Sequence, residues 1–423
     1  MKQVLKTIWS NDFITLNNWQ LVCLYIYQII VLVILPKFDV STELFITRIQ
    51  SSKESIYHPF IKSILEGMMS WDSVYILKLS MEGITYEHEW VFAPLLWRFM
   101  YQLRVLINTI FQYEMNVYDI TLCYFIINCV LLYQICQISK KIVELIIRND
   151  YLKDVSIDSN TINLFTYLRP IGVISLICYS ETPAQFFTFY GVYLYLSSFT
   201  KSKTFINSKV KYLLSGVMFS VAFGIRSNCL LMGILYLNDL FTLSRKRDKL
   251  LSLFTGGILF ISFIYLTYLP YFLYCPERGE WCNSTTKSLV SYLQVTRWNN
   301  GFLNYFTLNN IPNFIISLPT VLFIALMNVI LWNIKSVRGL VYISWVYLFT
   351  QVFFMNIQII TRVSSFLPIT IIALSLGVYE CEMKENKLVR VLNDSKFISI
   401  YLFGTFIWNF IQPMLFGAFL PPA

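Results

Sequence analysis

Apolar runs long enough to cross a membrane recur along this chain from one end to the other. About 20 mostly apolar residues in a helix cross the hydrocarbon layer of a bilayer, which is ~30 Å thick. Only 13% of the residues are charged and 56% are hydrophobic, whereas about 25% of the residues of a soluble domain are charged. The sequence therefore predicts an all-α polytopic membrane protein, in which residues 1–423 form a single integral membrane domain.

The basic residues predict how the chain is oriented in the membrane. Lys2 and Lys6 precede the first apolar run, and basic residues favour the cytosolic side. We expect about eleven transmembrane helices, at residues 21–36, 119–139, 160–179, 184–199, 209–225, 227–243, 250–274, 311–334, 338–358, 363–379 and 396–417. The basic connections then fall in the cytosol, at residues 140–148, 201–209, 244–247, 335–338 and 384–390.

A further apolar segment, residues 91–112, is predicted to lie in the membrane interface rather than to cross. Its apolar residues recur at helical spacing and its polar residues share the opposite face, as in interfacial helices. The apolar face holds Leu95, Leu96, Phe99, Met100, Leu103, Leu106, Ile107, Ile110 and Phe111, and the polar face holds Arg98, Tyr101, Gln102, Asn108 and Gln112. If this segment crossed, the basic connections would move to the lumenal side. We therefore expect a large first lumenal loop at residues 37–118.

A second sizeable lumenal loop is expected at residues 275–310. Cys275 and Cys282 bracket a polar turn there, and the sequon Asn283-Ser284-Thr285 follows at once. Disulfides and N-linked glycans both form on the lumenal or extracellular face. Cys275 and Cys282 are therefore disulfide candidates and Asn283 is a glycosylation candidate. The spacing does not decide whether the two cysteines pair.

The composition excludes several classes of function. The net charge of +9 gathers in short connections between apolar runs, so membrane orientation explains it and we expect no nucleic-acid partner. The sequence contains no P-loop and no glycine-rich dinucleotide turn. His58 and His88 are the two histidines, which is too few for a histidine metal site. We expect no metal and no cofactor.

Polar motifs that lie far apart in the sequence are predicted to converge on the lumenal side. They are Asp72 with Glu87 and Glu89, Tyr179-Ser180-Glu181, Arg226-Ser227-Asn228, residues 292–302 and residues 358–362. A carboxylate at the membrane surface can take a proton from a sugar hydroxyl, and an arginine suits the phosphate of a lipid. Residues 292–302 are rich in aromatic and amide side chains, as sugar-binding loops often are.

Structural roles would explain several of the same residues. Asp72, or Ser70 before it, can cap the helix that follows, and Glu181 can favour the dipole of a helix that begins beside it. Arg226 and Arg362 can be snorkelling ends of short transmembrane helices. Spacing alone does not separate these roles from a role in substrate binding.

Six motifs follow one another in a recognisable order. They are Trp71-Asp72-Ser73-Val74-Tyr75 with Tyr86-Glu87-His88-Glu89 and Phe92-Ala93-Pro94, then Tyr179-Ser180-Glu181, Gly224-Ile225-Arg226-Ser227-Asn228, residues 292–302, Ile311-Pro312-Asn313-Phe314, and residues 356–362. Together they resemble the PIG-V family, the GPI mannosyltransferase 2 enzymes of the endoplasmic reticulum. Ala93, Arg297 and Asn300 depart from the residues usual in the family, which is typical of a divergent yeast-type member.

The resemblance implies a GT-C glycosyltransferase fold whose first lumenal loop carries an acidic catalytic group. It implies transfer of the second mannose, in α1,6 linkage, from dolichyl-phosphate mannose to the mono-mannosylated GlcN-acyl-phosphatidylinositol precursor of GPI anchors. The donor is β-linked and the product α-linked, so one displacement with inversion suffices. The family also implies an endoplasmic reticulum membrane location with a lumenal active site. Fungal members imply a small accessory membrane subunit.

The same resemblance implies the roles of individual residues. We expect Asp72 to be the catalytic base, with Glu89 as the alternative, because an inverting transfer needs one base. Arg226 and Arg362 are expected to bind the phosphates of the donor or the acceptor. The remaining expected substrate-binding residues are Trp71, Glu87, His88, Tyr179, Glu181, Asn228, Gln294, Trp298 and Gln358.

Three other functions are compatible with a chain of this kind. Another GT-C transferase that uses a dolichyl-phosphate sugar but a different acceptor is separated from the first hypothesis by the family motifs alone. A lipid or sugar transporter would place polar groups near the middle of the bilayer, often in repeated halves, and we find no internal repeat. A non-catalytic subunit of a larger transferase would not need Asp72 for turnover.

Overall fold

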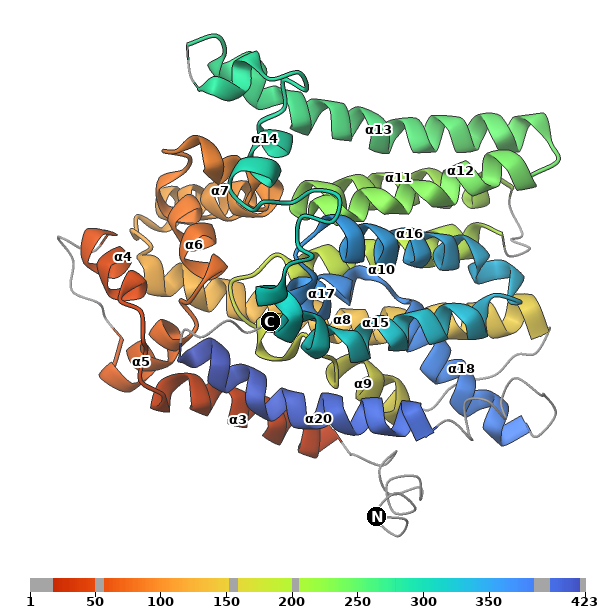
Figure 1. The fold of residues 1–423 in the computed structure, drawn as a ribbon, viewed down its shortest axis with the longest axis horizontal. Coiled ribbons are helices and arrows are strands. Elements are labelled where there is room, and N and C mark those ends of the chain that lie inside the picture. Colours follow the sequence, from red (N-terminus) through yellow and green to blue (C-terminus); the bar gives the residue numbers. More distant parts are fainter. Residues whose placement is uncertain are drawn as a thin grey trace.

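The computed structural model describes residues 18–49, 57–151, 159–199, 205–277, 279–383 and 396–418. Within these ranges the regular elements are α-helices and short 3₁₀ helices, so the prediction of an all-α protein is confirmed. Most of the longer helices run side by side along the horizontal direction of Figure 1.

Nine helices form the body of the described structure. They are α3 (Asn18–Ile34), α8 (Val117–Tyr151), α10 (Glu181–Ser198), α11 (Phe205–Ile225), α13 (Lys246–Tyr274), α15 (Ile311–Leu331), α16 (Arg338–Phe354), α18 (Ile369–Met383) and α20 (Lys396–Gly417). The other α-helices connect them: α4 (Ser41–Ile49), α5 (Pro59–Gly67), α6 (Asp72–Glu82), α7 (Pro94–Phe111), α9 (Ser159–Tyr167), α12 (Gly233–Thr242), α14 (Leu289–Thr296) and α17 (Ile360–Val363). The 3₁₀ helices are η1 (Glu87–Val91), η2 (Gly172–Ser175), η3 (Ser227–Met232), η4 (Glu280–Asn283), η5 (Leu308–Asn310), η6 (Lys335–Val337), η7 (Ile357–Ile359) and η8 (Ser364–Phe366).

The protein is a multi-pass membrane protein. Five helical stretches of the described residues are long and apolar enough to cross a bilayer: Val117–Asp150, Asn207–Ile225, Lys246–Tyr274, Leu308–Leu331 and Lys335–Phe354. A sixth arises if Ile357–Phe366 and Ile369–Gly377, which meet at an angle of 71°, form one bent crossing. The number is smaller than the eleven expected, partly because several predicted transmembrane helices are broken.

The predicted helix at residues 160–179 is wrong as a continuous element. The helix α9 ends at Tyr167, and the chain then passes through the 3₁₀ turn η2. Pro170 lacks the N–H that a helix interior needs. Gly172 has φ of +55°, a backbone conformation that glycine adopts at no steric cost. The two residues together end the helix about halfway along the predicted segment.

Two other predicted transmembrane helices are also interrupted. The segment 227–243 begins with the 3₁₀ helix η3, and its α-helical part, α12, is short. The segment 363–379 bends by 71° between η8 and α18. The bend lies at Pro368, and a proline disfavours helical conformation in the residue before it.

Side chains from neighbouring helices satisfy the carbonyl groups that the break after α9 leaves unpaired. The indole nitrogen of Trp408 donates to the carbonyl of Pro170 at 2.8 Å, and Asn128 Nδ2 donates to the carbonyl of Ile177 at 2.6 Å. Irregular backbone at membrane depth persists only where the protein itself satisfies its polar groups. The break is therefore a built feature of the fold.

The two ends of the helical body differ in composition. The helices α4, α5, α6, α7 and α14 gather toward the left end in Figure 1, and the α12–α13 and α15–α16 junctions lie at the right end. Those junctions carry basic residues, including Arg245 before α13 and Lys335 in η6. The acidic first-loop motifs and these basic connections thus lie at opposite ends of the molecule.

A small second core joins the first loop to the loop at 275–310. Trp90 of η1 and Trp281 of η4 are buried together with Cys282 and Leu293. Cys275 and Cys282 form a disulfide with their Cα atoms 5.6 Å apart, the pairing that the sequence did not decide. This core holds α14 beside the first loop.

Candidate active site

A cavity of about 460 Å³ lies where the first loop, the interrupted helices and the segment after α14 meet. Nine of the expected site residues line it: Trp71, Asp72, Tyr179, Arg226, Asn228, Gln294, Trp298, Gln358 and Arg362. Three of the contributing segments, at residues 179–180, 225–228 and 355–363, are irregular or broken. Irregular backbone inside a membrane protein characteristically lines a cavity, and these three segments do so here.

Asp72 occupies the first position of α6. The N-cap residue is Trp71, which has no side-chain capping hydrogen bond and has φ of +57°. The interpretation of Asp72 or Ser70 as the cap is therefore wrong. A positive φ is uncommon for a residue other than glycine and costs free energy. Trp71 and Ala93, with φ of +43°, both line the cavity, so strained backbone flanks Asp72.

Four charged side chains of alternating sign form a chain of ion pairs beside the cavity. Arg362 Nη1 lies 2.9 Å from Asp72 Oδ2, and Arg362 Nε lies 3.2 Å from Glu181 Oε1. Arg226 Nη1 lies 2.8 Å from the same Glu181 oxygen. Glu181 is completely buried, whereas 35% of the Asp72 side chain is exposed. Seen from the cavity, Glu181 thus lies behind the two arginines, and Asp72 lies on their cavity side.

The arginines are held within the protein rather than extended toward the membrane surface. Their side chains are 16–17% exposed, and both contact Glu181. Arg226 also donates to Ser180 Oγ at 2.8 Å. Arg226 and Arg362 both line the cavity. Snorkelling therefore does not describe these two residues, which form the positive wall of the cavity.

Tyr179 contacts Asp72 from the interior of the protein. The backbone N–H of Asp72 donates to the Tyr179 hydroxyl at 3.2 Å. The Arg362 guanidinium lies 5.4 Å from the centre of the Tyr179 ring, within the range of a cation–π interaction. Tyr179 is almost completely buried, so it contacts both members of the Asp72–Arg362 pair from inside the protein.

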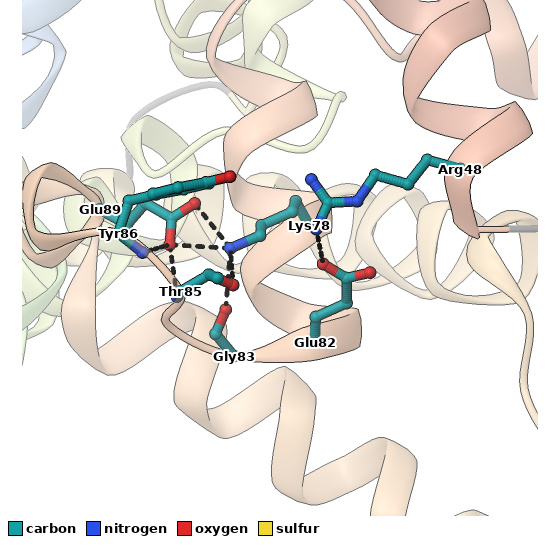
Figure 2. A network of polar contacts seen from close by, with 7 residues as sticks. All are labelled: Arg48, Lys78, Glu82, Gly83, Thr85, Tyr86 and Glu89. Carbon is teal, nitrogen blue, oxygen red and sulfur yellow. Dashed lines mark hydrogen bonds and ion pairs between the residues drawn. The ribbon is translucent and has the colours of Figure 1, made fainter.

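Glu89 lies elsewhere and forms a structural network, which Figure 2 shows. Its carboxylate is 2.7 and 2.8 Å from Lys78 Nζ and accepts the backbone N–H groups of Thr85 and Tyr86 at 2.8 and 2.9 Å. Burial raises the pKa of Glu89, but Lys78 and the two N–H donors outweigh it, so the pKa is lowered overall. The side chain is 2% exposed and does not line the cavity.

Glu87 and His88 also lie outside the cavity wall. Glu87 Oε2 accepts the indole N–H of Trp281 at 3.0 Å, which ties the first loop to the second. The His88 ring stacks on Tyr86, with centroids 5.8 Å apart. These contacts are typical of loop packing, and Glu181 likewise lies behind the cavity rather than in its wall.

Carboxamide side chains line the cavity in greater number than the sequence hypotheses included. Asn300, Gln351 and Asn356 join the expected Asn228, Gln294 and Gln358. Asn300 had stood out only as a departure from a family motif. Gln351 lies within the apolar helix α16 and is 4% exposed. A polar residue inside a transmembrane helix is usually functional, and this signal could have identified Gln351.

The described residues contain no group of three or more His, Cys, Asp and Glu side chains that could hold a metal ion. Among the described residues that line the cavity, Asp72 is the one carboxylate, and none is a histidine or a cysteine. Its chemistry is that of one acid–base group, two guanidinium groups and several amides.

Comparisons with known proteins show which family the chain resembles. A family described as mannosyltransferase (PIG-V) matches residues 16–336 and 332–423. The chain is 32% identical to GPI mannosyltransferase 2 of Candida albicans over 96% of this chain and 100% of the relative. It is 31% identical to the Kluyveromyces lactis protein of that name, over 91% of this chain and 92% of the relative. The corresponding Saccharomyces cerevisiae protein is 30% identical, over 94% and 96%. No solved structure matches.

Proposed function

The chain belongs to the PIG-V family of mannosyltransferases, and from this premise we propose that it is a GPI mannosyltransferase 2 of the endoplasmic reticulum membrane. It transfers the second mannose, in α1,6 linkage, from dolichyl-phosphate mannose to the mono-mannosylated GlcN-acyl-phosphatidylinositol precursor. The observation that carries the proposal is the cavity in which Asp72 lies beside Arg362 and Arg226. A base and two phosphate-binding groups are what this reaction requires.

Asp72 acts as the general base. The 6-hydroxyl of the acceptor mannose attacks C1 of the donor mannose, its proton passes to the Asp72 carboxylate, and the bond from C1 to the phosphate oxygen breaks. The electron pair leaves with dolichyl phosphate, and one displacement inverts the β donor to the α product.

The ion pair with Arg362 orients this base. Arg362 holds Asp72 Oδ2 at 2.9 Å, and Oδ1 has no hydrogen-bond partner in the described part of the chain. Oδ1 can therefore receive the proton while Arg362 holds Oδ2 in place. Fixed orientation of a catalytic group lowers the barrier because the group does not have to be ordered during the reaction.

Arg226 and Arg362 stabilise the phosphate that leaves. Dolichyl phosphate departs as an ionised group, so the reaction needs no general acid, and positive charge near the leaving oxygen lowers the barrier. A guanidinium group can contact two phosphate oxygens at once. Glu89 has a structural role in this proposal, because its carboxylate is already bound to Lys78 and to backbone N–H groups.

The finer architecture is also a proposal. We infer a GT-C fold with about eleven crossings, a first lumenal loop at residues 37–118 and α7 lying in the interface. Exposed apolar side chains on α7, among them Phe99, Leu106 and Ile110, support the interfacial position. Fungal members of the family motivate the further proposal of a small accessory membrane subunit.

The experiment is lipid analysis of cells whose only copy of the protein carries Asp72→Asn. We expect a GPI precursor with one mannose to accumulate while the variant is still made and inserted. The control is Glu82→Gln on the same helix, since Glu82 pairs with Arg48 at the surface and does not line the cavity. Normal two-mannose product in the Asp72→Asn cells would refute the assignment of the base.

A further inference from the structure

The side chains that line the cavity are of two chemical kinds. Asp72, Arg226 and Arg362 are charged, whereas Gln294, Asn300 and Gln358, which we call the carboxamide wall, are amides and line the cavity together with Trp298. The proposed reaction brings a lipid phosphate and two sugars to this cavity. The charged side chains suit the phosphate, and the carboxamides with Trp298 suit a sugar.

Backbone hydrogen bonds join the carboxamide wall into one surface. After α14 the chain turns back, so that the N–H of Asn300 donates to the carbonyl of Gln294 at 2.8 Å. The N–H of Gly301 then donates to the carbonyl of Phe354 at 3.0 Å. Phe354 ends α16 just before the segment with Gln358. Residues 294–301 and 354–358 are therefore held side by side although they are distant in the sequence.

The amides of Gln294 and Asn300 form a pair with unused hydrogen-bonding capacity. Asn300 Nδ2 donates to Gln294 Oε1, and Asn300 Oδ1 is buried with no hydrogen-bond partner among the described residues. Each amide has one oxygen acceptor and one NH₂ donor. The mutual bond uses one of each, so the pair retains one acceptor and one donor group. Exchanging the orientation of both amides leaves the same two capacities.

A hydroxyl group matches this capacity more fully than a phosphate does. An ionised phosphodiester only accepts hydrogen bonds, so it can use the remaining donor group of the pair but not the remaining acceptor. A sugar hydroxyl both donates and accepts. Asn228 presents the same requirement, because its Oδ1 is also buried without a partner in the described structure. A buried acceptor without a partner is unfavourable, and a hydroxyl that donated to it would remove that cost.

An aromatic face completes the wall. Trp298 lines the cavity and packs edge-on against Phe92, with ring centroids 6.4 Å apart. Aromatic residues combine a large apolar face with restricted geometry, which suits the C–H face of a pyranose ring. The amides beside the ring would meet the hydroxyl groups at its edge.

We propose that Gln294 and Asn300, with Trp298, form a sugar subsite that binds the hydroxyl groups of a mannose residue and makes no contact with the lipid phosphate. The proposal rests on the proposed function for the identity of the sugar. The mannose belongs either to the acceptor glycolipid or to the donor, and the chemistry of recognition is the same in both. Asn300 is a specificity-determining residue of this subsite.

The experiment measures equilibrium binding of three lipids to the purified full-length protein and to its Asn300→Ala variant. The lipids are a mono-mannosylated glucosaminyl-phosphatidylinositol, dolichyl-phosphate mannose and dolichyl phosphate. We expect the Kd of one sugar-bearing lipid to rise about tenfold, because one buried hydrogen-bonding group loses its partner. The Kd of dolichyl phosphate is expected to remain unchanged, since that lipid has no sugar.

The lipid whose Kd rises identifies which mannose occupies the subsite. Unchanged Kd values for both sugar-bearing lipids, or an equal rise for dolichyl phosphate, would overturn the proposal. Thr296→Ala on α14 is the matched control, because Thr296 is exposed and does not line the cavity. Asn300→Ser, which keeps a group that donates and accepts, is expected to restore part of the binding.

A different result would refute the proposed function. If the wild-type protein binds these lipids but transfers no mannose between them, the function is wrong while the comparison of Kd values still decides the subsite. Gln294→Leu provides a second variant if Asn300→Ala does not fold. Its effect is expected to be similar and not additive with Asn300→Ala, because the two amides act as one pair.

Discussion

Glu181 contacts both arginines of the cavity from behind. It is fully buried, and its Oε1 atom lies 2.8 Å from Arg226 Nη1 and 3.2 Å from Arg362 Nε. In a medium of low dielectric constant two neighbouring guanidinium groups would repel each other. Glu181 therefore allows two positive charges to be held close together, and its role is to position the groups that contact the substrate.

Glu181→Gln is expected to lower both stability and activity. Removing one partner of a buried ion pair leaves uncompensated charge, so the free energy of unfolding should fall by on the order of 3 kcal/mol. Thermal unfolding of the purified protein in detergent measures this change. Glu82→Gln, which removes an exposed partner of Arg48, should change stability by less than about 1 kcal/mol. Equal effects of the two substitutions would contradict the assigned role.

Glu89 is expected to act as a structural carboxylate and to make stability sensitive to acid. Its folded-state pKa lies below the ordinary value of 4.5, so its contribution is complete above about pH 4.5 and is lost as the pH falls through the lower folded-state pKa. Unfolding temperatures measured from pH 7 to pH 3.5 should therefore fall more steeply for the wild type than for Glu89→Gln.

Folded Glu89→Gln protein should keep turnover within about tenfold at pH 7, whereas loss of a general base costs about 100-fold or more.

At the scale of elements, the helix breaks are the features that build the site. The predicted helices at 160–179, 227–243 and 363–379 are all interrupted. Residues 179–180 and 225–228, beside the first two interruptions, line the cavity, as does the segment 355–363 that follows α16. Each break exposes backbone groups, which neighbouring side chains must satisfy. The stability of these breaks is therefore coupled to polar residues on helices such as α8 and α20.

Asn409→Leu is expected to destabilise the break after α9. Asn409 Nδ2 donates to the carbonyl of Arg169 at 3.0 Å, and loss of the donor leaves a buried carbonyl unsatisfied at a cost of about 1–3 kcal/mol. The measurement is the unfolding temperature of the purified variant. Ile407→Ala on the same helix replaces an exposed residue and should have a smaller effect. A variant as stable as the wild type would contradict this account of the break.

The apolar runs of the sequence predicted the transmembrane helices only in part. The helix α8 begins near its predicted start but continues to Tyr151, through residues 140–148, which were expected to form a cytosolic connection. The length of the apolar runs identified α11, α13, α15 and α16 near their observed positions. It failed at 160–179 because an apolar run of that length satisfies the same criterion whether it is straight or broken. Pro170, Gly172 and Pro368 carried the missing information, since each disfavours a continuous helix.

At the scale of the whole molecule, contacts between distant residues could not be predicted from spacing. Asp72 and Arg362 are 290 residues apart and form a direct ion pair. The charge pattern placed their motifs on one side of the membrane, and the family resemblance implied their roles, but neither indicated that they touch. Glu89 was the alternative base by sequence. Its buried bonds to Lys78 and its position outside the cavity lining distinguish it from Asp72.

The orientation of the molecule predicts which sequon carries a glycan. Asn283 is exposed at the end of η4, in the loop expected to be lumenal, so an endoglycosidase should shift the mobility of the wild type but not of Asn283→Gln. The second sequon, Asn393-Asp394-Ser395, follows the basic run at residues 384–390, which favours the cytosol. A glycan at Asn393 would contradict the proposed orientation.

The most direct test of the central claim is the rate of mannose transfer by the purified protein and its Asp72→Asn variant, with dolichyl-phosphate mannose and the mono-mannosylated precursor. Asparagine keeps the shape of Asp72 but cannot accept the proton, so kcat should fall about 1,000-fold while the Kd for dolichyl phosphate changes little. The wild-type product should carry the new mannose in α1,6 linkage. Turnover by Asp72→Asn within tenfold of the wild type would contradict the account.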